Sequence, residues 1–221
     1  MHLELVELLR CPHDHAPSVL VAAADTIANR YVTEGLLGCP QCYAEYPVRG
    51  GVTHFAAARP QDASNSVSVD PMRLAAQLGL TAGRSVFALI GYDITTIAAM
   101  REIVAARILL FNASGVDGVA FPTERIQNSA LAAPLGVATF GDILPLVHGK
   151  FDGIAVQAGH SSPRLLEQAS AALRSGGRLV ADVRSPLPAG VRELVRDDFV
   201  WVSERESVAS TPVGITRRLS R

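Results

Sequence analysis

A chain of 221 residues with 48% hydrophobic residues and a net charge of -1 is long enough and apolar enough to bury a core, which excludes intrinsic disorder. The near-neutral charge and a pI of about 6.6 give no reason to expect nucleic-acid binding. No apolar run approaches the roughly 20 residues that cross a bilayer, and residues 1–12 lack the pattern of a secretion signal. We therefore expect a cytoplasmic protein without a membrane segment.

The N-terminal residues 1–58 carry all three cysteines of the chain. Cys11 and the pair Cys39-x-x-Cys42 lie at two predicted turns, each marked by a proline after the cysteine. Three cysteines are an odd number for a disulfide framework. Two turns that present thiolates to one tetrahedral ion are typical of a zinc ribbon, so we predict a structural zinc site.

The sequence does not determine which residue is the fourth ligand of this predicted site. Position 14 is Asp, where a Cys-x-x-Cys pair that begins at Cys11 would have its second cysteine. His13, Asp14 and His15 are the candidates, since imidazole and carboxylate both bind zinc. We favour a histidine, because imidazole suits a mixed thiolate site better. The alternative is that the cysteines are reduced, buried and free of metal.

Residues 59–69 are polar and have no periodicity, which predicts a linker between domains at 1–58 and 70–221. Asp70 followed by Pro71 then predicts the beginning of a helix. Its predicted buried stripe consists of Met72, Leu74, Ala75 and Leu78.

Strands and helices alternate along the rest of the chain, a pattern typical of a parallel sheet covered by helices. The predicted strands are residues 85–90, 107–111, 137–140, 153–158 and 178–183, followed by a terminal antiparallel hairpin at 199–207 and 211–221. The predicted helices are residues 95–106, 123–132, 163–175 and 191–195.

Residues 141–183 give the clearest pattern. An uncharged apolar strand is followed by a helix, which Ser162 caps and Pro163 begins, and then by a second strand. Such a unit is right-handed and places ligands at the carboxyl ends of its parallel strands. We therefore expect a small-molecule ligand at that edge of the sheet.

The same residues resemble the second half of class I S-adenosylmethionine (SAM)-dependent methyltransferases. The features that carry the resemblance are Gly141-Asp142, Leu144-Pro145, Phe151-Asp152, His160, Gly176-Gly177 and the strand at 178–182. With the terminal hairpin, the resemblance covers residues 70–221 and implies an α/β fold with a Rossmann-like, seven-stranded methyltransferase domain. It also implies SAM as the cofactor, Asp142 as a ligand of adenine and His160 as a catalytic base.

The first loop of this domain departs from the family pattern, in which an acidic residue and three glycines surround the cofactor. The aligned positions hold Ala88, Ile90, Tyr92 and Ile94. Gly91 lies nearby, and Asn112 stands where the family has an acidic residue for the ribose, so both remain candidates for cofactor binding. Two lost charged hydrogen bonds of about 1.5–3 kcal/mol each would weaken SAM binding by roughly two to four powers of ten.

The N-terminal segment resembles the small zinc-ribbon proteins that activate tRNA and release-factor methyltransferases. The residues that carry this resemblance are Leu8-Leu9-x-Cys11-Pro12, Cys39-x-x-Cys42 and Tyr46-Pro47-Val48-Arg49-Gly50-Gly51-Val52. It implies a small zinc-ribbon-like β domain. Such activators pair by addition of a strand to a sheet edge, so strand edges of the ribbon are the expected contact with a partner.

Two functions remain open. The first is a divergent SAM-dependent methyltransferase that acts on a small molecule, a peptide or a protein. The second is a catalytically inactive family member, a pseudoenzyme, whose ribbon or Rossmann surface binds a protein partner or a second copy of the chain. Tyr92 and Asp93 either plug the cofactor pocket or line another one, and the sequence does not decide between these.

Overall fold

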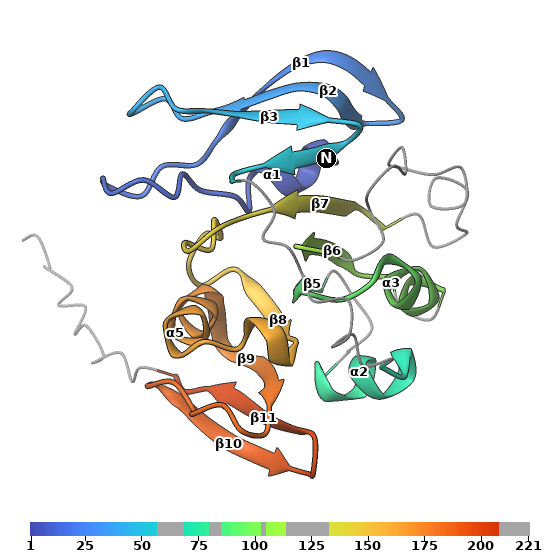
Figure 1. Ribbon diagram of the computed structural model, residues 1–221, viewed down its shortest axis with the longest axis vertical. Helices are drawn as coiled ribbons and strands as arrows, with labels where there is room; N and C mark the ends of the chain where they lie inside the picture. Colours follow the sequence, from blue (N-terminus) through green and yellow to red (C-terminus); the bar gives the residue numbers. More distant parts are fainter. Residues whose placement is uncertain (57–68, 80–84, 103–104, 114–132, 208–221) are drawn as a thin grey trace, which may run out of the picture.

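The computed structural model describes residues 1–56, 69–79, 85–102, 105–113 and 133–207. In these residues the strands form an 11-stranded sheet in the order β1-β2-β3-β4-β7-β6-β5-β8-β9-β11-β10 (Figure 1). The helix predicted at 123–132, the strand predicted at 211–221 and all but the last residue of the predicted linker lie outside the described residues.

An antiparallel meander makes up the N-terminal module. Its elements are α1 (Leu3–Val6), β1 (Val21–Ala28), β2 (Tyr31–Gly38), β3 (Glu45–Arg49) and β4 (Val52–His54). Two-residue turns join β1 to β2 and β3 to β4, and both residues of each turn have positive φ: Asn29-Arg30 and Gly50-Gly51. Turns of this kind match the right-handed twist of the strands they join.

The module is joined to the carboxyl-terminal sheet by β4. This strand pairs in parallel with β7 (Leu135–Thr139), in a register that sets Val52 beside Val137 and His54 beside Thr139. The sheet-edge addition that the resemblance implies for a partner therefore takes place within one chain. The domain boundaries at 58 and 69 stay a prediction.

The carboxyl-terminal strands are β5 (Val86–Ile90), β6 (Arg107–Phe111), β7, β8 (Phe151–Val156), β9 (Leu173–Asp182), β10 (Val191–Arg196) and β11 (Val200–Arg205). The strands from β5 to β9 are parallel, and β10 and β11 form an antiparallel hairpin. With β5 counted as the first strand, the order is 3-2-1-4-5-7-6, which begins as the Rossmann order does. The predicted Rossmann-like sheet of seven strands is confirmed.

Helices cover both faces of this sheet (Figure 1). They are α2 (Pro71–Gln77), α3 (Ile94–Arg101), the short η2 (Ala158–His160) and α5 (Pro163–Ala172). The predicted caps are present, since Asp70 accepts the backbone N–H of Met72 and Ser162 accepts that of Leu165. Met72 itself is 57% exposed, so its predicted place in the buried stripe is wrong.

Side chains alternate between two cores, one on each face of the sheet. Along β5, Val86, Ala88 and Ile90 enter the core on the face of α1 and α5, whereas Phe87 and Leu89 enter the core that contains residues of α2 and α3. Consecutive residues of a strand point to opposite faces. An uncharged apolar run is therefore what a strand buried on both faces requires.

The end of α5 differs from the prediction. The helix ends at Ala172, because Leu173 has an extended backbone and β9 already pairs with β8 there, through Phe151 and Leu173. The pair Gly176-Gly177 thus lies inside a strand and does not end a helix.

The terminal hairpin also lies earlier than predicted. Residues 191–195 form a strand, not a helix, and this strand pairs antiparallel with β11 in a hairpin of the described residues. Their apolar residues have helical spacing, but Leu194 and Val195 are 39% and 55% exposed, so no core holds a helical face here. Asp197 closes the turn by accepting two backbone N–H bonds.

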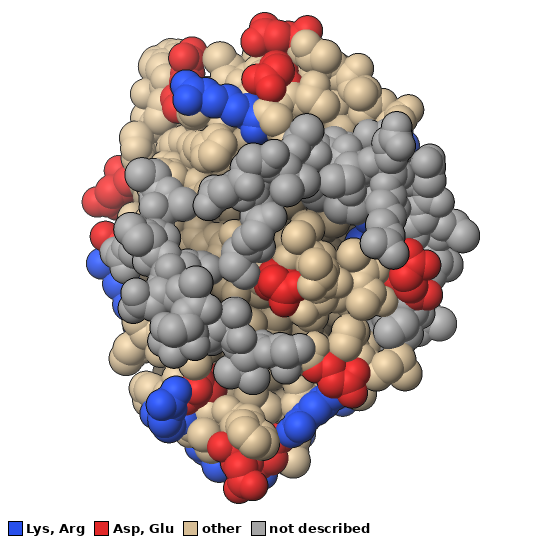
Figure 2. All heavy atoms as spheres, turned by 45° about the vertical axis from the view of Figure 1, so that its right-hand side comes forward, with Lys and Arg blue, Asp and Glu red and all other residues tan. Residues whose placement is uncertain are grey.

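Acidic and basic side chains are interspersed on the face that Figure 2 shows. Exposed ion pairs of the described residues include Arg30 with Glu4 at 2.8 Å and Arg73 with Asp197 at 2.6 Å. Exposed pairs of this kind contribute about 0–1 kcal/mol each, so the two cores carry the stability of the fold.

Candidate metal centre and ligand edge

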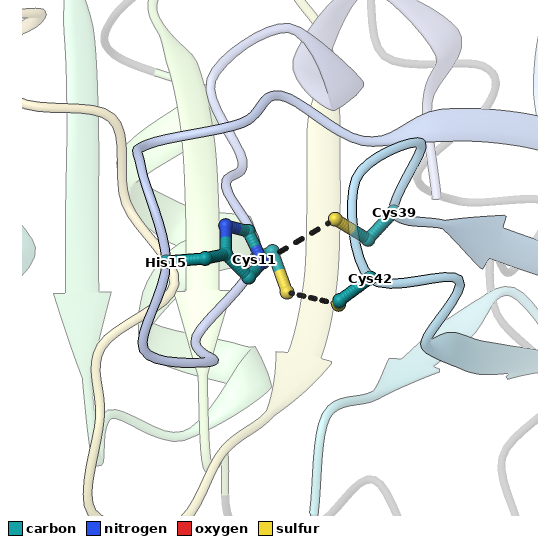
Figure 3. A group of neighbouring side chains, drawn as sticks. All are labelled: Cys11, His15, Cys39 and Cys42. Carbon is teal, nitrogen blue, oxygen red and sulfur yellow. Dashed lines mark hydrogen bonds between the residues drawn. The ribbon is translucent and has the colours of Figure 1, made fainter.

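Four donor side chains of the N-terminal module converge on one point (Figure 3). Cys11 and His15 come from the loop between α1 and β1, and Cys39 and Cys42 come from the turn between β2 and β3. Their ligand atoms all lie within 4.8 Å of one another. Cys11 Sγ is 3.6 Å from Cys42 Sγ, and His15 Nε2 is 3.5 Å from Cys39 Sγ.

These separations fit a tetrahedral zinc ion. Zinc binds sulfur at about 2.3 Å and imidazole nitrogen at about 2.0–2.1 Å, so the edges of a tetrahedral site are about 3.8 Å from sulfur to sulfur and about 3.5 Å from sulfur to nitrogen. The two measured distances are close to these values. Three thiolates and an imidazole also form a donor set that selects zinc over magnesium or calcium.

The other candidates for the fourth ligand lie at the margin of the group. His13 Nδ1 is 3.5 Å from Cys42 Sγ, but His13 is exposed and its ring stands edge-on to Tyr46. Asp14 is exposed and does not belong to the group. The geometry therefore favours His15 among the three.

The turn between β2 and β3 prepares one thiol for ionisation. Tyr43, with a φ of 60°, donates its N–H to the carbonyl of Cys39, and Cys39 donates its N–H to Ala44. Burial opposes ionisation of Cys39, but hydrogen bonds from the backbone of Cys42 and Gln41 and from the neighbouring thiols outweigh it and lower the pKa of Cys39 to about 6. A thiolate is the form of cysteine that binds metal.

Cys11 has the opposite electrostatic environment. Burial raises the pKa of the Cys11 thiol, and the Tyr46 hydroxyl and the backbone of His13 act against that increase through hydrogen bonds. The group therefore favours a thiolate at Cys39, and a bound cation would favour ionisation of Cys11.

The second candidate region is the carboxyl edge of the parallel strands. Gly91, Asn112, Asp142 and His160 follow β5, β6, β7 and β8, so the topology brings them to one edge. The strand order reverses between β5 and β8, and ligands of open α/β sheets bind outside the carboxyl ends at such a switch point. Gly91 and His160 flank this point.

The ring of His160 lies over Gly91. A Cβ at position 91 would be 3.0 Å from His160 Nε2 and closer still to Cδ2, and Gly91 has a φ of +83°. Two independent features therefore require glycine at this position, namely the backbone conformation and the nearby imidazole.

Asn112 links two strand ends. Its backbone is left-handed, with a φ of 47°, which Asn tolerates better than most residues. Its Nδ2 donates to the carbonyl of Phe140 at 3.1 Å, and its Oδ1 accepts the N–H of Phe140 at 2.9 Å. The amide therefore holds the end of β6 to the end of β7.

No protein-family model matches the chain, and no curated protein matches its sequence. Solved structures do resemble it. The geranyl diphosphate C-methyltransferase from Streptomyces coelicolor A3(2), in complex with Mg2+, geranyl-S-thiolodiphosphate and S-adenosyl-L-homocysteine, is 14% identical, with a TM-score of 0.42 over 50% of this chain and 41% of that chain. The present chain thus spans less than half of that enzyme.

Two further structures show the same similarity. The antibiotic-resistance methyltransferase Kmr is 16% identical, with a TM-score of 0.44 over 64% of this chain and 95% of that chain. A complex that contains the Haloferax volcanii Trm112 methyltransferase activator matches at 18% identity, with a TM-score of 0.37 over 51% of this chain and 50% of that chain. The strand order 3-2-1-4-5-7-6 and the antiparallel pairing of β11 with β9 determine the fold. The carboxyl-terminal sheet has the methyltransferase fold.

Tyr92 and Asp93 of the first loop make structural contacts. Tyr92 is buried in the core that contains residues of α2 and α3, and burial raises its pKa. Asp93 caps α3 by accepting the N–H groups of Thr95 and Thr96. Tyr92 therefore belongs to the core, and Asp93 stabilises the helix that follows it.

Asp142 lies on an exposed loop that α5 holds in place. The carbonyl of Asp142 accepts a hydrogen bond from Gln168 Nε2 at 3.2 Å, and Gln168 Oε1 accepts the N–H of Leu144 at 2.6 Å. The backbone of this loop is thereby held at the rim of the carboxyl edge. Its role, like those of Gly91, Asn112 and His160, stays a prediction.

One residue at this edge has no signal in the sequence. His54 ends β4, and its Nδ1 lies 3.3 Å from Oγ1 of Thr139 at the end of β7. Only the parallel pairing of β4 with β7 brings this histidine to the carboxyl edge of the methyltransferase sheet, so no local pattern could identify it.

Among the described residues, no helix is long and apolar enough to cross a bilayer.

Proposed function

We propose that this chain is a SAM-dependent methyltransferase with a zinc-binding module built into the same sheet. The observation that carries the proposal is the continuity of that sheet. The group of Cys11, His15, Cys39 and Cys42 and the strands in methyltransferase order are joined by the pairing of β4 with β7. The cytoplasm, where thiols stay reduced, is the compartment that suits such a module.

The zinc site would be structural. Cys11, His15, Cys39 and Cys42 would hold the ion, and four protein ligands leave no position for an activated water. The ligands come from the loop before β1 and the turn between β2 and β3, which meet at one end of the meander, so a shared ion would fix these two segments relative to each other.

The carboxyl edge would hold the cofactor. Gly91, Asn112 and Asp142 would lie along it, and His160 would stand beside the methyl acceptor as the general base. Bound SAM supplies a methyl group on a positively charged sulfur. Because the His160 ring lies over Gly91, we expect this ring to turn away when the switch point is occupied. The acceptor would be a small molecule, a peptide or a protein.

Two observations support a second function, that of a catalytically inactive subunit that binds a protein partner or a second copy of the chain. The imidazole of His160 fills the space over Gly91, and both ends of the Asn112 amide already bond the backbone of Phe140. A scaffold without a cofactor would use these contacts to close its own sheet edge.

Calorimetric titration of the zinc-loaded chain with SAM and with S-adenosylhomocysteine tests the proposal. Saturable heat with both ligands is expected, and no heat at millimolar ligand would remove the methyltransferase function and favour the second one. The variant Asp142→Ala should weaken binding, whereas Asp198→Ala, which removes an exposed carboxylate in the turn between β10 and β11, should not. Metal analysis should give about one zinc per chain, since the described residues contain one group of four ligands.

A further inference from the structure

A tyrosine hydroxyl contacts the candidate metal centre from inside the core. Tyr46 Oη lies 3.1 Å from Cys11 Sγ. Tyr46 is 5% exposed and Cys11 is 4% exposed, so the contact is closed to water. A polar hydrogen on a buried hydroxyl needs an acceptor, and among the described residues the Cys11 sulfur is the one in reach.

The position of the Tyr46 ring is fixed by its neighbours. Tyr46 lies on β3 and pairs with Leu37 of β2. Its ring centroid is 4.8 Å from that of Phe55 and 6.2 Å from that of His13, which stands edge-on. The hydroxyl is therefore held toward Cys11 by packing, which is what a group that orients a ligand requires.

A hydrogen-bond donor beside Cys11 would stabilise the negative charge of the metal centre. Three thiolates and one dication leave the centre with one excess negative charge, and part of that charge resides on Cys11. A hydrogen bond to a charged acceptor is about twice as strong as one between neutral groups, the more so where water is excluded. Groups that bond a metal ligand from outside typically change metal affinity by about 10–100-fold.

We propose that Tyr46 is a positioning residue of the metal centre: its hydroxyl donates to the Cys11 thiolate and holds this ligand in place for a tetrahedral ion. The inference rests on the proposed zinc site and adds a residue to it. It also gives the site a direct contact with the core, because Phe55, which packs on Tyr46, donates its N–H to Thr139 of β7.

The test compares Tyr46→Phe with Tyr43→Phe. Tyr43 follows Cys42 in the same turn but is 83% exposed, so its hydroxyl is a matched control. Each full-length protein is titrated with cobalt(II), and zinc is then competed against a chromophoric chelator. Tyr46→Phe should keep the sulfur-to-cobalt charge-transfer and tetrahedral d–d bands but bind zinc roughly tenfold more weakly. Tyr43→Phe should change zinc affinity by less than about twofold.

The outcomes separate this inference from the proposed function. Zinc affinity that is equal in Tyr46→Phe and the wild type would overturn the role of Tyr46 and leave the metal site intact. A wild-type chain that binds neither cobalt nor zinc would overturn both. Should Tyr46→Phe not fold, NMR of the wild type loaded with cadmium-113 decides: the Tyr46 hydroxyl proton should exchange slowly and show a coupling to the metal, and absence of this signal would overturn the inference.

Discussion

The contact between His160 and Gly91 can be measured by adding a single methyl group. Gly91→Ala places a Cβ where the imidazole ring of His160 now lies, 3.0 Å from Nε2 and closer to Cδ2. It also forces a side chain onto a backbone with a φ of +83°. We expect this substitution to destabilise the chain through two separable effects.

The magnitude follows from those two effects. A left-handed backbone costs a residue with a Cβ roughly 1–2 kcal/mol, and overpacking by one carbon costs typically about 1–3 kcal/mol. The sum is about 2–5 kcal/mol, a large part of the total stability of about 5–15 kcal/mol that folded proteins have. Gly149→Ala is the matched control, because Gly149 has a φ of +68° but no heavy atom within 4 Å of the added carbon. It should cost only about 1–2 kcal/mol.

Urea unfolding of five proteins completes the measurement: the wild type, Gly91→Ala, Gly149→Ala, His160→Ala and the double variant of Gly91 and His160. If the ring fills the space over Gly91, removing it should recover about 1–3 kcal/mol of the cost of Gly91→Ala and leave the backbone strain. The reasoning is refuted if Gly91→Ala costs no more than Gly149→Ala, or if His160→Ala recovers nothing.

Three further outcomes are expected. Compared with the chain at a zinc concentration near 100 times Kd, the chain stripped of zinc by a chelator should melt about 5–10 °C lower. Trp201 fluorescence in β11 should report the same single transition as far-UV circular dichroism, since one sheet joins the N-terminal module to β11. Thr53→Val should stabilise the chain by about 1 kcal/mol in urea unfolding, because Thr53 Oγ1 is buried and has no hydrogen-bond partner among the described residues; a loss of stability would contradict this. Asp93→Ala should cost about 1 kcal/mol at pH 7 as a lost helix cap. Burial opposes ionisation of Asp93, but hydrogen bonds from Thr95 and Thr96 outweigh it and lower its pKa, so the contribution is complete above the unfolded pKa of about 3.9 and is lost as pH falls through the folded pKa. An equal cost at pH 7 and at pH 2 would contradict this account.

Local signals in the sequence were sufficient where one short segment determines the outcome. The run at 85–90 is apolar at every position from 86 onward and forms a strand buried on both faces. Asp70 and Ser162 cap helices because a cap needs only the next three residues. The methyltransferase order of the strands was reached through the resemblance, since pairing between distant strands leaves no local pattern.

Prediction from the sequence failed where a contact between distant residues determines the local structure. Residues 191–195 have the apolar spacing of a helix, but the pairing of β10 with β11 determines their conformation. The choice between His13 and His15 could not be made from sequence, since both lie on one short loop. Only the position of the turn between β2 and β3 brings His15 within 4.8 Å of all three cysteine sulfurs. His54 reached the carboxyl edge by the same kind of long-range pairing.

Several contacts join the N-terminal module to the carboxyl-terminal sheet. The pairing of β4 with β7 comprises three residue pairs, a short contact for two separate molecules that must give up their translational and rotational freedom. Close packing adds to it at Gly136 of β7, where a Cβ would lie 2.8 Å from Met1 Sδ and 3.1 Å from Leu5 Cδ1. The Tyr31 hydroxyl accepts the N–H of Leu135 at 3.4 Å. Backbone hydrogen bonds from Arg10 to Pro145 and from Val147 to Leu8, together with the core shared on the face of α1 and α5, extend this contact, so the metal centre and the methyltransferase sheet are held together well beyond the pairing of β4 with β7.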